Sequence, residues 1–382
     1  MWRCAVAAQS GPGHTSTAFG VTVVRESLLV VVAAAAVPDI TLETMVAGLP
    51  LGRRITLAAA RAGLSTIASS EPGPRRLILV PSNVIPQPRW LRVLAAMPLP
   101  PETLWVDPAQ VAVVETSDPK PILDAAGRAG GVGECVATLR ERFTVVEGPA
   151  DLTGRFPLRA AGDLDAAESW LLRGLVKDTE GVMSRHVERR ISLALTRYLV
   201  RTSVTPNAVT LVCVAIGLVA APFFLSSAPA FQLVGALLFL LHSILDGCDG
   251  EIARLKFLES RGGAALDFWG DNTVHVAVFG CMAVGWSLSA HSGWPLAVGA
   301  IAIASTLFAA SIVSPHLVSR SAPPPRSAGA RMADALANRD FIYLIVVLAV
   351  FGKAAWFIIF VAIGTPIFAL VRIWADRPRA KA

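Results

Sequence analysis

Long apolar segments fill the second half of the chain and restrict its possible folds more than any other feature. They lie near residues 207–226, 229–247, 264–286, 293–315, 333–352 and 354–374. A helix of about 20 apolar residues is long enough to cross a bilayer. The last two segments are short and share a tight turn, so the sequence defines their limits poorly. The pattern predicts an α-helical membrane bundle of six transmembrane helices over residues 206–382.

The composition agrees with a membrane protein that carries a soluble part. Of the 382 residues, 54% are hydrophobic and 16% are charged. The five cysteines are odd in number and form no close pair, which favours neither a disulfide framework nor a zinc site. The net charge is +6, and the basic residues collect beside apolar segments, as in contacts with lipid headgroups. We therefore expect membrane lipid, and no nucleic acid, as a partner.

The connections between the apolar segments differ in their positive charge. The connections at 254–261 and 317–340 hold three and four Lys or Arg residues, and the tail from Arg372 holds four. The opposite connections hold only Lys353. Because cytoplasmic connections are enriched in Lys and Arg, we expect an inner or cell membrane protein whose N-terminal part and C-terminus are both cytoplasmic.

Four carboxylates lie at the edges of two of these apolar segments, where an uncompensated charge is costly. They are Asp246, Asp249, Asp267 and Asp271. Their spacing of three or four residues places each pair on one face of a helix, so two helices can bring the acids together. Scattered acids in a solvated loop would have polar neighbours, and the only nearby cations for salt bridges are Arg254, Lys256 and Arg261. Oxygen ligands alone favour Mg²⁺ or Mn²⁺ over Zn²⁺.

The same two stripes carry small residues and an arginine at fixed spacing. Gly250, Ala253 and Gly263 allow the close approach of a backbone or a ligand. With Arg254 they complete the pattern Asp-x2-Asp-Gly-x2-Ala-Arg-x8-Gly-x3-Asp-x3-Asp over residues 246–271. All eight fixed positions resemble the signature of the CDP-alcohol phosphotransferases, integral membrane enzymes of phospholipid and polar-lipid synthesis.

The resemblance implies a reaction and a set of roles. The enzyme would transfer the phosphoalcohol group of a CDP-alcohol to an acceptor hydroxyl and release CMP, with two divalent metals per active site. Asp246, Asp249 and Asp267 would be metal ligands, and Asp271 would be both a ligand and the catalytic base. The substrate-binding residues would be Asn207, Thr210, Gly250, Ala253, Arg254, Ser260 and Gly263. The resemblance also implies a homodimer. The positive charge of the connections predicts that the acid cluster, and with it the active site, is cytoplasmic.

Several of these residues have simpler interpretations. Helix capping explains Thr205 and Asn207 equally well, and Ser260 lies in a polar loop. Arg320 and Arg339 are candidates for binding an anionic acceptor, but they also fit as anchors on the positive side of the membrane. The histidines His186, His242, His275 and His316 show no ligand spacing, and we interpret them as structural.

Residues 1–160 predict a soluble α/β domain. A strand is expected over residues 28–37 and another over 77–80, with helices leading to Gly63, over 88–97, and over 123–143 around a glycine-rich break. Further strands are expected over residues 103–115. This order is similar to the sugar-nucleotidyltransferase fold, whose segment after the nucleotide loop resembles Val46-Ala-Gly-Leu-Pro-Leu.

The residues that bind nucleotide and metal in that fold are mostly missing here, so we interpret the domain as degenerate. The stretch Gln9-Ser-Gly-Pro-Gly-His has only a short glycine pair where the resemblance calls for a phosphate loop. The strand at 77–80 ends in Pro81-Ser82-Asn83, where a metal-binding carboxylate is expected. Asp107 remains an alternative carboxylate.

Residues 161–205 form a linker. Residues 183–201 set apolar side chains against five arginines, which predicts an amphipathic helix that lies on an anionic membrane surface. An ordinary surface helix of the soluble domain is the alternative.

Two other functions remain open at this stage. A Mg²⁺-dependent membrane prenyltransferase also uses Asp-rich motifs, but it usually places them in separate halves. A transporter can place acids in a helical bundle, but it does not need Gly, Ala and Arg at these spacings. The sequence leaves open whether the donor is CDP-diacylglycerol or a CDP-polyol, and which alcohol accepts.

Overall fold

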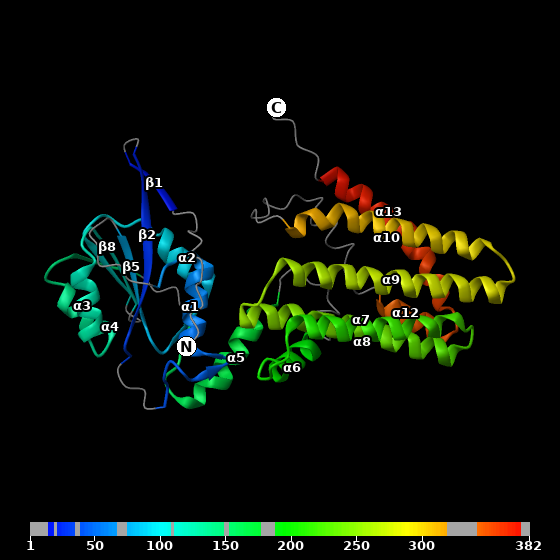
Figure 1. Ribbon diagram of the computed structural model, residues 1–382, viewed down its shortest axis with the longest axis horizontal. Helices are drawn as coiled ribbons and strands as arrows, with labels where there is room; N and C mark the ends of the chain where they lie inside the picture. Colours follow the sequence, from blue (N-terminus) through cyan, green and yellow to red (C-terminus); the bar gives the residue numbers. More distant parts are fainter. Residues whose placement is uncertain are drawn as a thin grey trace, which may run out of the picture. The chain divides into compact units, whose positions relative to one another are not determined.

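The computed structural model describes residues 14–18, 21–34, 39–66, 75–107, 111–148, 153–176, 188–318 and 342–375. The chain divides into two compact units, Met1–Trp170 and Leu171–Ala382, each described below by itself (Figure 1). Several sequence predictions lie outside the described residues. These are the glycine pair near residue 11, His186, Arg320, Arg339 and the side chain of His316.

The first unit contains a mixed six-stranded sheet with the order β1-β2-β5-β8-β7-β9. The strands are β1 His14–Ala18, β2 Val21–Val32, β5 Arg75–Pro81, β8 Val111–Thr116, β7 Thr103–Asp107 and β9 Thr144–Glu147. The pairs β2–β5 and β7–β9 are parallel, and the other pairs are antiparallel. Every residue of β5 is buried, including Arg75 and Arg76, and its apolar part at 77–80 is typical of the centre of a covered sheet.

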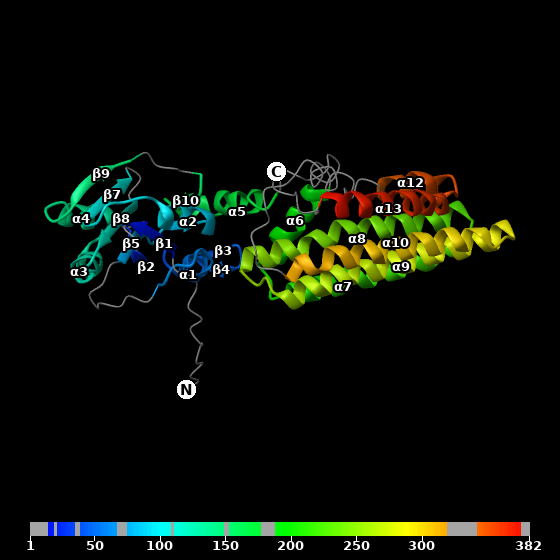
Figure 2. The same ribbon diagram turned by 90° about the horizontal axis from the view of Figure 1, so that it is seen from above.

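Helices cover both faces of this sheet (Figures 1 and 2). One side carries α1 Leu51–Ala62 and α2 Pro88–Ala96, and the other carries α3 Lys120–Arg128 and α4 Val132–Leu139 (Figures 1 and 2). Helix α1 ends at Gly63, whose φ of 84° is a left-handed conformation that glycine adopts without strain. The predicted glycine-rich break separates α3 from α4. Helix α5, Leu164–Arg173, follows two short strand pairs, β3 Met45–Val46 with β4 Leu49–Pro50, and β6 Val84–Pro86 with β10 Arg155–Pro157.

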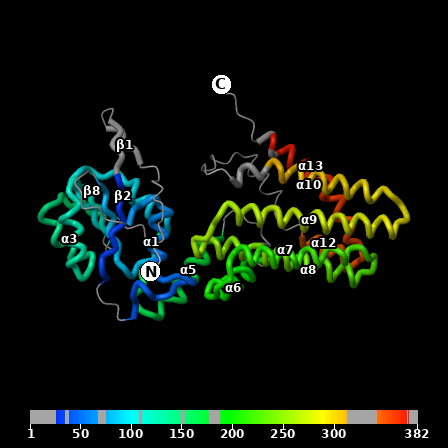
Figure 3. Tube along the Cα trace, in the orientation of Figure 1, coloured from blue at the N-terminus to red at the C-terminus, as the bar shows by residue number. Residues whose placement is uncertain are grey.

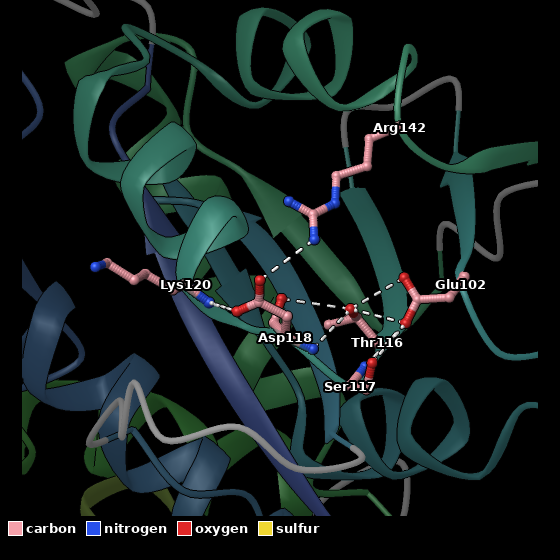
Figure 4. Close-up of polar contacts among 6 residues, drawn as sticks. All are labelled: Glu102, Thr116, Ser117, Asp118, Lys120 and Arg142. Atoms are coloured by element: carbon pink, nitrogen blue, oxygen red, sulfur yellow. Dashed lines mark hydrogen bonds and ion pairs between the residues drawn. The ribbon is translucent and has the colours of Figure 1, made fainter.

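A polar cluster lies at the end of the sheet where β7 begins beside the last residues of β8 (Figure 4). The Glu102 carboxylate accepts hydrogen bonds from the Thr116 hydroxyl at 3.1 Å and from the Ser117 amide at 3.0 Å. Arg142 lies 3.3 Å from the Asp118 carboxylate, which also accepts from the Lys120 amide. These contacts satisfy backbone groups at the strand ends, so we assign the cluster to the fold.

The second unit is a helical bundle. After α6 Arg189–Leu199, it contains α7 Pro206–Ala220, α8 Pro229–Lys256, α9 Arg261–Ala290, α10 Trp294–Val318, α12 Ile342–Val350 and α13 Phe357–Ala375. Short 3-10 helices extend α7 over Ala221–Leu225 and precede α13 over Ala354–Trp356. The long helices run side by side in Figures 1 and 3.

Among the described residues, five helices are long and apolar enough to cross a membrane, where the sequence predicts six. The fifth predicted segment, 333–352, begins outside the described residues, and its described part is the nine-residue helix α12. Helix α8 continues to Lys256, beyond the predicted end at 247, because the signature itself is helical. The core contains Phe224, Phe239 and Val278, whereas Leu211, Phe308 and Ile363 are exposed, as on a lipid-facing surface.

Candidate metal and substrate site

Three of the four signature aspartates converge between α8 and α9. Asp246 on α8 and Asp267 and Asp271 on α9 each place a carboxylate oxygen within 4.8 Å of the others. Asp267 and Asp271 are one helical turn apart, so they share one face of α9. Asp246 is buried, and the other two are partly buried. A cluster of carboxylate oxygens of this size suits a hard divalent cation such as Mg²⁺ or Mn²⁺.

Asp249 lies next to this group but is held differently. Its carboxylate accepts a short hydrogen bond from the hydroxyl of Thr210 on α7 and another from the backbone amide of Gly250. Thr210 and Asp249 are both buried. Thr210, which we predicted to contact substrate, therefore contacts a predicted metal ligand.

Three predicted substrate-binding residues meet where α7 and α9 begin. Ser260 caps α9 by accepting a hydrogen bond from the Gly263 amide at 2.9 Å. A Cβ atom at Gly263 would lie 3.0 Å from Asn207 Oδ1 and 3.0 Å from Ser260 Oγ. Thr205 rather than Asn207 provides the side-chain cap of α7, by accepting from the Ala208 amide. Asn207 is therefore not explained by capping.

Arg254 folds back along α8 toward Gly250. A Cβ atom at Gly250 would lie 3.0 Å from Arg254 Nη1, so the glycine makes room for the guanidinium group. Ala253 is half-buried on the same helix. Gly250, Ala253 and Arg254 follow Asp246 and Asp249 on the same helix, so a cation is available near the acids.

Sequence reasoning missed a contact of His242, which we interpreted as structural. Its Nδ1 lies 2.9 Å from the backbone carbonyl of Cys213, to which it donates because a carbonyl oxygen only accepts. Its Nε2 lies 3.5 Å from Asp271 Oδ1. His242 precedes Asp246 by four residues, so continuing the stripe of acids toward the N-terminus of α8 would have identified it.

Sequence reasoning also missed Glu251, which lies within the signature. Its side chain is fully buried, and it accepts hydrogen bonds from three residues of α6. The donors are Arg189 Nη1 at 2.6 Å, Ser192 Oγ at 2.9 Å and Thr196 Oγ1 at 2.6 Å. The predicted amphipathic helix thus turns a polar stripe toward α8, while Ile191 and Tyr198 remain exposed.

The candidate residues of the first unit are committed to structural contacts. Asp107 is buried with Arg155, at 2.6 Å between carboxylate and guanidinium. Ser82 Oγ accepts a hydrogen bond from the Ala34 amide, and Asn83 Nδ2 donates to the Leu158 carbonyl at 2.7 Å.

Arg54 stabilises the hairpin in the Val46-Ala-Gly-Leu-Pro-Leu segment by donating to the carbonyls of Val46 and Ala47. Burial lowers the pKa of Arg54 to about 10, against a smaller opposing effect of Glu168.

One comparison with known proteins matches a stretch of the second unit. Residues 203–370 match the family model of the CDP-alcohol phosphatidyltransferases. A bifunctional IPC transferase and DIPP synthase of Thermococcus kodakarensis is 40% identical over 106 residues, 28% of this chain and 23% of that protein. A protein of the same description from Rubrobacter xylanophilus is 36% identical over 148 residues, 38% of this chain and 33% of that protein. The alignments thus span no more than about a third of these two relatives.

Two further known proteins are similar to this chain. The inner membrane protein YnjF of Escherichia coli is 38% identical over 93 residues, 23% of this chain and 44% of that protein. The crystal structure of Mycobacterium tuberculosis phosphatidylinositol phosphate synthase, PgsA1, with CDP-DAG bound, superposes with a TM-score of 0.36 at 19% identity. It covers 50% of this chain and 100% of that one.

The helical unit is thus an integral membrane domain that carries a carboxylate cluster. Residues 203–370 belong to the CDP-alcohol phosphatidyltransferase family.

Proposed function

We propose that the protein transfers the phosphoalcohol group of a CDP-alcohol to the hydroxyl of an acceptor and releases CMP. The observation that carries the proposal is the convergence of the carboxylate oxygens of Asp246, Asp267 and Asp271 within 4.8 Å. The family match of residues 203–370 supports the reaction class over a prenyltransferase or a transporter.

Asp246, Asp249, Asp267 and Asp271 would hold two Mg²⁺ or Mn²⁺ ions, which supply charge neutralisation for a diphosphate and its leaving group. Four carboxylates can balance the charge of two divalent ions. Asp249 would serve as a ligand while Thr210 orients its carboxylate.

The chain's own groups would then perform the transfer. Arg254 would bind the donor diphosphate through two parallel N–H groups. Asp271 would accept the proton of the acceptor hydroxyl. The oxygen of that hydroxyl would form a bond to the phosphorus that carries the alcohol, while the bond between this phosphorus and CMP breaks. Asn207, Ser260 and Gly263 would bind the nucleotide, together with the surface around Gly250 and Ala253. Arg320 and Arg339 stay predicted contacts of an anionic acceptor.

The proposal also includes the orientation of the protein in the membrane and its oligomeric state. The positive charge of the connections supports a cytoplasmic acid cluster, first unit and C-terminus. We propose a homodimer in the membrane, as the family resemblance implies. Lipid would take part as donor or acceptor, with CDP-diacylglycerol slightly favoured over a CDP-polyol as the donor.

A donor screen tests the reaction. The full-length protein in detergent would be given CDP-diacylglycerol, CDP-inositol or CDP-glycerol separately, with Mg²⁺ or Mn²⁺ and candidate alcohols. We expect CMP release from at least one donor, and mass spectrometry of the product identifies the alcohol. CMP release from CDP-polyols alone would remove the CDP-diacylglycerol assignment, and no release from any donor with any acceptor would contradict the reaction class.

Two substitutions test the acid cluster. Asp246→Asn and Asp267→Asn keep the shape of the side chain but each removes one charge, so we expect CMP release to be abolished in a protein that still folds. Gel filtration and thermal unfolding check the fold. Full activity in either variant would contradict the assignment.

A further inference from the structure

Helix α6 holds the signature helix α8 from the side opposite the acid cluster. At 3.6 residues per turn, Glu251 projects about 140° around α8 from Asp246 and about 200° from Asp249. Contacts that hold the Glu251 side chain in place therefore restrict the rotation of α8 about its own axis. That rotation sets the direction in which both aspartates point.

The contact is fully buried on the α8 side and satisfies both oxygens of Glu251. Oε1 accepts from Arg189 and Ser192, and Oε2 accepts from Thr196. The three donors lie at i, i+3 and i+7, on one face of α6. A buried carboxylate is costly unless it is paired and hydrogen-bonded, so Glu251 strongly favours the arrangement in which α6 supplies all three donors.

Further contacts fix α8 against the same segment. A Cβ atom at Gly247, the residue after Asp246, would lie 3.2 Å from Arg189 Nη1. Cys248 Sγ lies 3.6 Å from the Ser192 carbonyl, and Lys256 Nζ donates to the Thr202 carbonyl at 2.7 Å. These contacts follow α8 from Gly247 to Lys256, a stretch that begins directly after Asp246 and contains Asp249 and Arg254.

We propose that Glu251 and its donors Arg189, Ser192 and Thr196 are positioning residues that orient the metal-binding turn of α8. The proposal rests on the proposed function, because it assigns a role to α6 in the same site. It assigns no contact with metal or substrate to any of the four residues.

Matched pairs of variants test the proposal by Mn²⁺ binding, with Mn²⁺ alone as the probe. Thr196→Val removes one donor and nearly keeps the shape, whereas Thr196→Ser keeps the hydroxyl. Arg189→Met removes the partly buried charge that contacts Glu251, and Arg190→Met removes the charge of its exposed neighbour. Electron paramagnetic resonance measures the free Mn²⁺ that remains when Mn²⁺ is titrated into the detergent-purified full-length protein.

We expect Thr196→Val and Arg189→Met to weaken Mn²⁺ binding by about tenfold or more, the range seen when groups that orient metal ligands are lost. Thr196→Ser and Arg190→Met should bind as the wild type does. Wild-type binding by folded Thr196→Val would overturn the proposal. If Arg189→Met fails to fold, the Thr196 pair decides alone.

The Asp246→Asn variant separates this proposal from the proposed function. If Asp246→Asn releases CMP as fast as the wild type, the metal-site assignment of the proposed function fails. If Asp246→Asn is inactive while Thr196→Val and Arg189→Met bind Mn²⁺ normally, only the positioning role fails.

Discussion

At the scale of single residues, the four signature carboxylates differ in what surrounds them. Asp246, Asp267 and Asp271 point at one another, and Asp271 also faces His242 Nε2 at 3.5 Å. Asp249 is fixed by Thr210 and by the Gly250 amide. A charge held by hydrogen bonds needs less reorganisation when a cation binds. We therefore regard Asp249 as the preorganised member of the group.

Two adjacent glycines provide a test of the predicted nucleotide end of the site. A Cβ atom at Gly263 would lie 3.0 Å from both Asn207 Oδ1 and Ser260 Oγ, whereas a Cβ atom at Gly262 would meet nothing within 4 Å. Because Gly263→Ala pushes the two polar groups apart, we expect the KM for the CDP-alcohol to rise several-fold. Gly262→Ala, the matched control, should leave the KM unchanged.

Steady-state CMP release at varied donor concentration measures both variants. Equal KM values for Gly262→Ala and Gly263→Ala would remove Asn207 and Ser260 from the nucleotide site. The acid cluster would be unaffected by that result.

At the scale of elements, α7 packs against both of the helices that carry the acids. It meets α8 through Thr210 and through the Cys213 carbonyl, which accepts from His242. It meets α9 at Gly270, whose Cβ would lie 2.6 Å from Val214 Cγ2. Gly270 precedes Asp271, so this small residue lets α9 approach α7 beside the acid cluster. The spacing between the acid pairs thus depends on a third helix.

Close packing far from the acids supports a second prediction. A Cβ atom at Gly285 would lie 2.3 Å from the Phe224 carbonyl oxygen and 2.8 Å from Leu225 Cα, both backbone atoms that cannot rotate away. We expect Gly285→Ala to destabilise the bundle by about 1–3 kcal/mol, the usual cost of overpacking. The measurement is the thermal unfolding midpoint in detergent.

Gly280→Ala on the same helix is the control for Gly285→Ala. Its Cβ would make an ordinary contact, 3.9 Å from Ile303 Cδ1. The control should melt at the wild-type temperature or slightly above it, because alanine favours the helix. Equal unfolding midpoints for the two variants would contradict the prediction that the backbone of Phe224 and Leu225 leaves no room for a Cβ atom at position 285.

The sequence predicted the elements better than the contacts between them. Spacing of three and four residues placed Asp246, Asp267 and Asp271 on helix faces, and apolar runs located five of the spans. The hydrogen bonds of Glu251 to α6 join residues 55 or more positions apart, and no periodicity reports such a pairing. His242 was visible in the stripe, but a lone histidine on an apolar face gives no sign of its partner.

At the scale of the whole molecule, the chain joins a membrane domain with a carboxylate cluster to an α/β domain whose own candidate residues serve its fold. Ser82 and Asn83, which follow β5, hydrogen-bond to the backbone of Ala34 and of Leu158. Asp107 is the remaining carboxylate we considered, and Arg155 neutralises it at 2.6 Å within the core. A buried ion pair is strongly destabilised when one partner is removed. Asp107 is thus committed to the domain rather than available to a metal.

These contacts predict that the first unit does not activate an alcohol phosphate with CTP. The full-length Asp267→Asn variant, in which the membrane site should be silent, would be incubated with CTP, Mg²⁺ and inositol or glycerol phosphate. We expect pyrophosphate release no faster than without protein, because Ser82 and Asn83 follow β5 where a carboxylate would hold the metal, and Asp107 is paired with Arg155. Release above that background would contradict the degenerate assignment.

An Asp107→Asn substitution in the same background separates the two roles of that carboxylate. A structural role predicts a loss of about 3–5 kcal/mol of stability, since Arg155 would be left as a buried charge. A metal-binding role predicts that pyrophosphate release disappears while the unfolding temperature stays the same. The unfolding temperature of the first unit should therefore fall in Asp107→Asn, with no pyrophosphate released either before or after the substitution.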